Sequence, residues 1–157
     1  MIEDIDGRTE TLGEIGLNHF APYLMNRIMG RYNDTLRGGL KANGLTTAQM
    51  RALATLVSIG PVTINELSVL SVFEQSTMSR TLDAMEAAGF VRREASETDS
   101  RVRLIHVTDE GRRTFENAWP AMHAVYSAMF DGVGADERAA FVATLQKILR
   151  NIRQHEI

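Results

Sequence analysis

Apolar residues recur at helical spacing along most of the chain, and this pattern predicts a mainly helical protein. In the first long segment every fourth residue is apolar, which gives one stripe on one helix: Phe20, Leu24, Ile28, Tyr32, Leu36 and Leu40. We expect this helix to begin at Asn18 as its N-cap, with Pro22 in or near the first turn, where a missing N–H costs least. Asn43-Gly44 is a good stop signal.

Two capping boxes mark the starts of two shorter helices. The first is Thr46-Thr47-Ala48-Gln49 and the second is Thr63-Ile64-Asn65-Glu66. Gly60-Pro61 ends the helix between them. After a brief turn at Ser71-Val72-Phe73, a fourth helix is expected from about Glu74 to Ala88, closed by Gly89 as its C′ residue. The spacing therefore predicts three helices in close succession.

The apolar period changes after Gly89. Phe90-Val91-Arg92-Arg93 is typical of a strand, and the polar stretch from Glu94 to Ser100 is typical of a turn. Val102 to Val107 alternates imperfectly and predicts a second strand. Together these segments predict a β-hairpin.

Two more helices complete the expected fold. Thr108 caps the first, Asp131-Gly132 breaks it, and the last begins at about Ala135. The fold class expected is mainly α with a small β-hairpin wing: a winged helix-turn-helix at about 45–110 between long helices at about 17–43 and 109–155, all within one domain over 1–157. The winged unit is too small to bury both flanking apolar stripes, so a symmetric partner chain is expected to cover them.

Charge limits the kinds of partner. The formal net charge is −3, which argues against non-specific, charge-driven binding of DNA by the whole chain. The N-terminal segment is acidic, with Glu3, Asp4, Asp6, Glu10 and Glu14 against Arg8 alone. Arginines gather in the middle of the chain, but acidic residues are interleaved with them. Any basic face must therefore come from the way the fold sorts these charges.

Several classes of protein are excluded by the sequence. No apolar run approaches the roughly 18 residues that cross a bilayer, and the N-terminus lacks the order of a signal peptide, so a cytoplasmic location is expected. The absence of cysteine excludes thiol redox sensing and Cys-ligated zinc. The four histidines show no metal-like spacing, and neither a nucleophile–base arrangement nor a phosphate-binding glycine loop is present. We expect no enzyme activity, no cofactor and no metal site.

The fourth helix separates into an apolar face and a polar face. Met78, Leu82 and Met85 fall at i, i+4 and i+7, so they mark the buried side. Small hydroxyl residues on the other side let a helix lie close to the DNA backbone, while a glutamine and an arginine have the reach to read adenine and guanine. The polar side and first turn contain Gln75, Ser76, Thr77, Ser79, Arg80 and Asp83. The alternative is an ordinary solvated helix, and this helix alone does not decide between the two.

The hairpin favours the DNA-binding alternative. Arg101 follows the turn and is expected to project from the wing, where a narrow minor groove attracts such a side chain. Asp99 is expected to hold Arg101, or an arginine of the fourth helix, in place. The alternative for Asp99 is a surface ion pair worth roughly 0–1 kcal/mol.

These motifs together resemble the MarR family of winged helix-turn-helix regulators. The wing signature is Asp99-x-Arg101, five residues, Val107-Thr108, two residues and Gly111, where Val107 replaces the usual leucine. Ser76 to Arg80, Leu82 and Gly89-Phe90-Val91 are similar to the family's recognition helix and first wing strand. The resemblance covers about Leu17 to Arg153. It implies a set of DNA-binding residues: Gln75, Ser76, Thr77, Ser79, Arg80, Asp99, Arg101 and Arg103.

Two positions depart from the family pattern. Ser100 stands where a second arginine is frequent, so the wing has one fewer contact to DNA. Glu74 stands where a Ser, Thr or Asp cap is usual, and it adds negative charge near the expected DNA face. Both departures predict modest affinity, or compensation by Arg92, Arg93 and Arg103.

The resemblance also implies a homodimer that binds a near-palindromic operator and responds to a small aromatic or anionic effector. Repression is favoured over activation because blocking a promoter needs only occupancy. The family's usual cleft would be lined here by His19, Tyr23, Arg27, Leu53, Trp119 and His123. The alternative is that these residues serve only the core and the dimer interface, with no ligand.

A second function class stays open. The chain is alternatively a helical dimer that acts through protein partners and carries a degenerate DNA-binding unit. Arg80 and Arg101 argue against this alternative, because neither is needed for packing.

Overall fold

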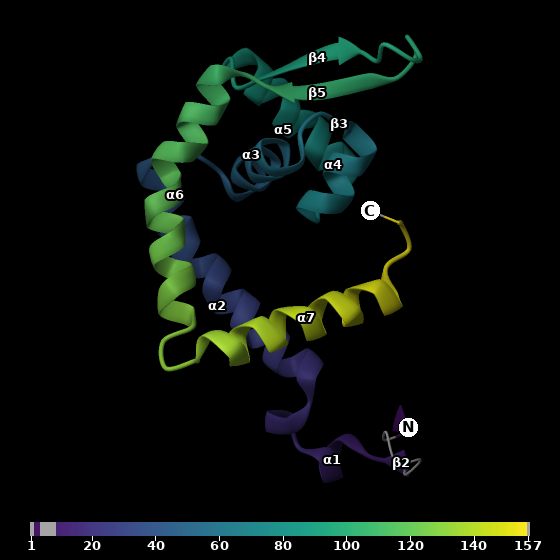
Figure 1. Ribbon diagram of the computed structural model, residues 1–157, viewed down its shortest axis with the longest axis vertical. Coiled ribbons are helices and arrows are strands. Elements are labelled where there is room, and N and C mark those ends of the chain that lie inside the picture. The colour runs from purple at the N-terminus through teal and green to yellow at the C-terminus, as the bar shows by residue number, and fades with distance from the viewer. Residues whose placement is uncertain (1, 4–8, 157) are drawn as a thin grey trace.

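Two long helices carry a small winged unit at one end of the molecule (Figure 1). The computed structural model describes residues 2–3 and 9–156. The long helices lie side by side and are α2 (Ala21–Ala42) and α6 (Asp109–Met129). The winged unit contains α3 (Thr47–Ile59), α4 (Ile64–Ser71), α5 (Gln75–Ala87) and the strands β3 (Val62–Thr63), β4 (Val91–Ala95) and β5 (Arg103–Val107). A last helix, α7 (Ala135–Ile152), follows α6.

The chain enters α2 later than the sequence predicts. Among the described residues, four short elements precede it: β1 (Ile2–Glu3), β2 (Thr9–Glu10), α1 (Leu12–Ile15) and the 3-10 helix η1 (Leu17–His19). The predicted N-cap, Asn18, is wrong because it lies inside η1, which the Phe20 N–H closes by donating to Leu17 O at 3.2 Å. Phe20 is the N-cap, and Pro22 lies in the first turn as expected. Asp4, Asp6 and Arg8 of the acidic segment lie outside the described residues.

Both capping boxes form as predicted. The Thr46 hydroxyl accepts from the Gln49 N–H at 3.2 Å, and the Gln49 side chain accepts from the Thr46 N–H at 3.0 Å. At the start of α4, the Thr63 N–H and Oγ1 donate to the Glu66 carboxylate at 2.7 and 2.8 Å. These reciprocal bonds satisfy backbone groups that a helix end leaves unpaired, which fixes where each helix begins.

The predicted hairpin is part of a three-stranded antiparallel sheet. β4 pairs with β5, with Val91 opposite Val107 and Arg93 opposite Ile105. β3 adds an edge strand on the other side of β5, with Val62 opposite Ile105. No pattern along the chain predicts β3, because a two-residue strand is too short to show alternation.

The winged unit contains most of the apolar core, which continues into α2 and α6. The predicted buried face of α5 is confirmed, since Met78, Leu82 and Met85 are all 0% exposed. They join a core that also contains Leu53, Leu56, Leu67 and Ile105. This core and the sheet confirm the predicted fold class of a winged helix-turn-helix between long helices.

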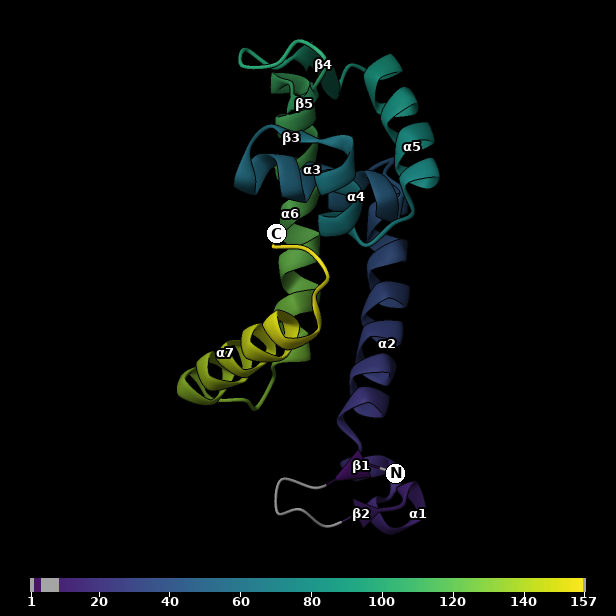
Figure 2. The same ribbon diagram turned by 90° about the vertical axis from the view of Figure 1, so that its right-hand side faces the viewer.

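The apolar stripes of the flanking helices are only partly covered. Leu36 and Leu40 of α2 are buried, but Leu24 and Ile28 nearer its start are 38% and 46% exposed. α7 crosses the molecule below the winged unit (Figure 1 and Figure 2) and has no buried residue. Its exposed apolar side chains are Phe141, Val142, Ile148, Leu149 and Ile152. None of the helices in the described part of the chain has a stretch long and apolar enough to cross a membrane.

Candidate nucleic-acid interface

The outer face of α5 presents the residues that the sequence assigned to base and phosphate contacts. Gln75, Ser76, Thr77 and Arg80 are exposed, whereas Ser79 is half-buried beside the core. Glu74 is the N-cap and its side chain makes no capping hydrogen bond. Within the described residues, the first-turn N–H groups of α5 therefore have no side-chain acceptor, which leaves the helix N-terminus open to an anion.

The wing tip is a turn held by its own polar groups. Ser96 N–H donates to Val102 O at 2.8 Å, and Val102 N–H donates to Asp99 O at 3.0 Å. The Asp99 carboxylate accepts from the backbone N–H of Arg101 at 2.9 Å. Asp99 thus fixes the backbone from which the predicted wing arginine, Arg101, projects.

Arg93 connects the wing to α5. Its guanidinium donates to Asp83 and to Glu86 of α5, each at 2.6 Å. The hydrogen bond to Asp83 raises the pKa of Arg93 above its usual value, and the charge of Glu86 adds to the effect against the opposing effect of burial. The sequence predicted that Arg93 helps to compensate for Ser100 and Glu74. In the structure, its charge is instead directed at Asp83 and Glu86.

The fold also sorts the other charges around the wing. Arg92 pairs with Glu94 at 2.5 Å on the outer face of the hairpin, and this hydrogen bond lowers the pKa of Glu94. His106 Nε2 lies 3.4 Å from the same carboxylate. Arg101 and Arg103 are exposed and form no ion pair with another described residue. Much of the acidic charge near α5 and the wing is therefore engaged, while these two arginines remain available.

The Thr108 and Gly111 pair attaches the hairpin to α6. The Thr108 hydroxyl donates to Gly89 O at 2.6 Å and accepts from the Gly111 N–H at 3.0 Å. The Thr108 N–H donates to Phe90 O at 3.0 Å. One residue thus caps α6 and ties it to the turn between α5 and β4, where Gly89 adopts a φ of +77°. This geometry explains the spacing of the last part of the wing signature.

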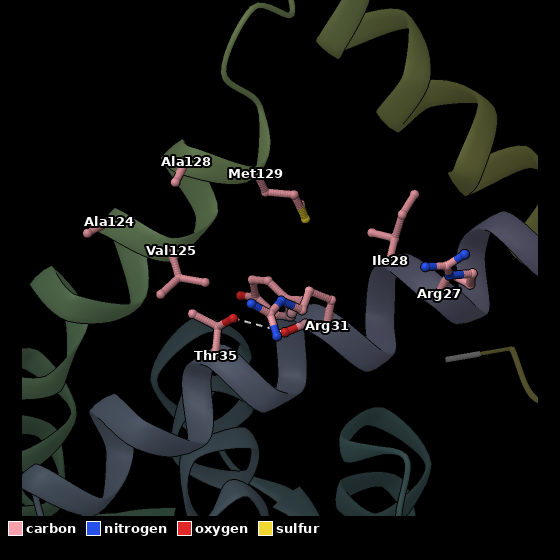
Figure 3. Close-up of a pocket in the computed structure, with 9 residues that line it drawn as sticks. Arg27, Ile28, Arg31, Thr35, Ala124, Val125, Ala128 and Met129 are labelled. Carbon is pink, nitrogen blue, oxygen red and sulfur yellow. Dashed lines mark hydrogen bonds between the residues drawn. The ribbon is translucent and has the colours of Figure 1, made fainter.

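A separate cavity of about 680 Å³ lies between α2 and α6 (Figure 3). The α2 side supplies two cations and two hydroxyl groups, and the α6 side is apolar: Arg27, Ile28, Arg31, Tyr32 and Thr35 face Ala124, Val125, Ala128 and Met129. Burial raises the pKa of the Tyr32 phenol, against a smaller lowering by the charge of Arg51. The volume of the cavity lies within the range of small-molecule sites.

The residues predicted to bind an effector divide between two helices and η1. Arg27 lines the cavity, and its guanidinium donates to Tyr23 Oη at 3.3 Å. His19 lies exposed at the end of η1. Trp119 and His123 lie on the exposed side of α6 with ring centroids 5.7 Å apart. Leu53 is fully buried in the core of the winged unit.

Sequence reasoning did not find Arg31 and Thr35, because they fall among the other polar residues of α2 and no pattern marks them. In the described part of the chain, no group of three or more histidine and carboxylate side chains is placed to hold a metal ion.

Comparison with known proteins identifies the family. The family model described as "MarR family" matches residues 43–102. A crystal structure of a MarR-family transcriptional regulator from Silicibacter pomeroyi is 50% identical, with a TM-score of 0.88, over 94% of this chain and 100% of that chain. The chain belongs to the MarR family of transcriptional regulators. Its function is therefore regulation of transcription through a helix-turn-helix, and not catalysis.

Two more distant proteins are also similar to this MarR-family chain. The HTH-type transcriptional repressor IacR of Pseudomonas putida is 24% identical over 133 residues, which are 85% of this chain and 80% of IacR. The crystal structure of a mutant MarR from E. coli complexed with operator DNA is 22% identical, with a TM-score of 0.72 over 90% of this chain and 99% of that chain. At that identity the likeness shows the fold alone.

Proposed function

We propose that this protein is a homodimeric, sequence-specific repressor that a small anionic molecule releases from its operator. The observation that carries the DNA-binding part is the pairing of two exposed elements at one end of the molecule (Figure 2). One is the polar face of α5, with Gln75 and Arg80; the other is the wing tip, with Arg101 held by Asp99. A helix of this kind enters a major groove, and an arginine at a wing tip suits a narrow minor groove.

A second copy of the chain is the proposed cover for the exposed apolar surfaces. α7 has no buried residue, and the first half of α2 also exposes large apolar side chains. Exposed apolar surface of this extent marks an interface. Two-fold pairing places one α5 per chain in successive major grooves, about one helical turn apart, so the operator is proposed to be a near-palindrome.

Repression is proposed because occupancy of a promoter is sufficient for it. IacR, which is named a transcriptional repressor, supports this choice. The cavity between α2 and α6 supports the effector. Arg27 and Arg31 suit a carboxylate or another anion, and the apolar α6 wall suits an aromatic or acyl group. The dimer is proposed to have two spacings of its α5 helices, of which only one matches the operator. A ligand that binds better to the other spacing shifts the dimer off DNA.

The test of this function is a salt titration of DNA binding. Duplexes enriched by the protein from a random-sequence pool are measured by fluorescence anisotropy at increasing salt. Phosphate neutralisation by a DNA-binding protein gives a steep negative slope of log K against log salt. The absence of such binding contradicts the proposal and favours the protein-interaction module.

The dimer and the effector need measurements of their own. Sedimentation equilibrium is expected to give twice the chain mass for the wild type, and Leu149→Glu on α7 is expected to give monomers that bind the operator poorly. A monomeric wild type contradicts the dimer. A thermal-shift screen against aromatic acids and acyl thioesters is expected to find a stabiliser that Arg31→Ala weakens, because a ligand that binds only the folded state raises stability by mass action.

A further inference from the structure

One arginine of the wing is bound to two carboxylates of α5. We propose that Arg93, Asp83 and Glu86 form a clamp that sets the position of the wing relative to α5. In this role Arg93 is a positioning residue for DNA binding and does not itself contact DNA. The inference rests on the proposed function, because it assigns a role within the same DNA-binding surface.

The guanidinium of Arg93 donates one hydrogen bond to each of the two carboxylates. Arg93 Nη2 lies 2.6 Å from Asp83 Oδ1, and Nη1 lies 2.6 Å from Glu86 Oε2. The backbone N–H of Arg93 also donates to Glu86 Oε1 at 3.3 Å. A planar guanidinium that donates along two directions fixes orientation as well as distance. The side chain of Arg93 is 28% exposed, whereas that of neighbouring Arg92 is 52% exposed. Arg93 therefore lies on the face of the hairpin that packs toward α5.

Strand alternation explains why this arginine faces α5. Val91 and Arg93 are two residues apart on β4, so they share one face of the strand, and Val91 is buried at 2% exposure. Arg92 lies on the opposite face, where it meets Glu94. On α5, Asp83 and Glu86 are three residues apart and therefore neighbours on the helix surface.

The clamp supplies a second attachment of the hairpin to α5. The first is the turn at Gly89, where Phe90 N–H donates to Met85 O at 2.8 Å. β3 and the start of α6 also hold the hairpin, through β5 and Thr108, but neither of these contacts joins the strands to α5. Arg93 lies further along β4 than this turn and bonds back to the body of α5, so it resists rotation of the hairpin about the turn. The position of Arg101 relative to Arg80 depends on this resistance.

Because of the charges of the clamp, the proposal is testable by whether DNA binding weakens or tightens when the two carboxylates are removed. Asp83 and Glu86 carry two negative charges against one positive charge on Arg93, and both carboxylates are partly exposed, at 65% and 41%. If electrostatics alone governed binding, removal of both carboxylates would tighten binding to DNA. If the clamp positions the wing, their removal weakens binding although the surface becomes more positive.

The experiment compares full-length Asp83→Ala/Glu86→Ala with the wild type on one duplex that the wild type enriches from a random-sequence pool. Binding is expected to weaken by about threefold to tenfold, as loss of two exposed charge-assisted contacts implies. The matched control is Glu74→Ala/Glu97→Ala, which removes the same charge near α5 and the wing from carboxylates in no ion pair with a described residue. The control is expected to bind equally well or more tightly. Equal or tighter binding by the clamp variant overturns the proposal.

A second variant distinguishes positioning from a phosphate contact. Arg93→Gln is expected to weaken binding while the slope of log K against log salt stays unchanged, because no phosphate contact is lost. If the magnitude of this slope decreases by about one, the clamp is overturned and Arg93 is a phosphate contact.

Amide hydrogen exchange of β4 and β5 in the free protein supplies a readout that needs no DNA. Exchange is expected to be faster in both clamp variants than in the wild type and the control. Unchanged exchange overturns the clamp. A wild type that enriches no duplex contradicts the proposed function alone, since the exchange result still decides the clamp.

Discussion

Gly111 packs directly against the backbone of Phe90. A Cβ placed on Gly111 would lie 2.1 Å from the Phe90 carbonyl oxygen and 2.9 Å from its carbonyl carbon. The same carbonyl oxygen accepts from the Thr108 N–H. The start of α6 therefore meets the base of the wing at a distance that only glycine permits, and the orientation of the wing depends on this contact.

Gly111→Ala is expected to destabilise the protein by about 1–3 kcal/mol, because backbone atoms must move to admit the new methyl group. The measurement is urea unfolding followed by circular dichroism. The control is Gly38→Ala in α2, where the added Cβ meets nothing within 4 Å. That change is expected to stabilise by roughly 0.5–1 kcal/mol. Equal stabilities for wild type and Gly111→Ala would contradict the close contact.

Val72 occupies the turn between α4 and α5 in a strained backbone conformation. Its φ is 58° and its side chain is 77% exposed, so a β-branched residue lies in the left-handed region without burial to offset the strain. Val72→Gly is expected to raise the free energy of unfolding by about 1 kcal/mol. Val72→Asn should act in the same direction. The control is Ser58→Gly in the regular helix α3, which is expected to lower the free energy of unfolding by roughly 0.5–1 kcal/mol. If Val72→Gly also lowers the free energy of unfolding, the assignment of strain is refuted.

Arg101→Ala is expected to weaken operator binding by at least about tenfold, because it removes the cation that the wing tip presents to a minor groove. A gel shift with the enriched duplex measures this. Arg37→Ala is the control, since Arg37 lies exposed on α2 and pairs only with Asp34 among the described residues. Unchanged affinity in Arg101→Ala would remove the wing from the DNA-binding surface.

Arg80→Ala is expected to reduce discrimination between sequences more than overall affinity for DNA. A bidentate contact from arginine to guanine contributes about 1–3 kcal/mol of discrimination. Competition between the enriched duplex and a scrambled duplex gives the specificity ratio for each variant. If both duplexes lose affinity by the same factor, Arg80 acts on the backbone and not on a base.

Tyr32 predicts a change of stability at high pH. Burial raises the pKa of its phenol above 10.0, so the folded state favours the neutral form more than the unfolded state does. This contribution is complete below a pH of about 10 and is lost as the pH rises through the pKa of the folded state. Tyr32→Phe is expected to remove this part of the alkaline loss of stability. The difference in phenolate absorbance between wild type and variant gives the midpoint, and a midpoint at or below 10.0 contradicts the burial.

The local signals in the sequence determined most of the elements. The capping residues Thr46, Thr63 and Thr108 each fix a helix start through bonds to residues three positions away, so the information is local. The i, i+4, i+7 spacing of Met78, Leu82 and Met85 determined which face of α5 is buried. Element order and length then led to the winged helix-turn-helix.

Only the tertiary structure decided which groups are engaged and which are free. The short strand β3 forms because β5 offers an unpaired edge to Val62, and a two-residue strand leaves no pattern in the sequence. Asp83 and Glu86 look like surface charges until β4 returns along α5 and brings Arg93 to them. The cavity between α2 and α6 likewise exists only where two helices far apart in the chain lie side by side. Distances of this kind depend on how elements pack, and residue spacing along one element carries no information about them.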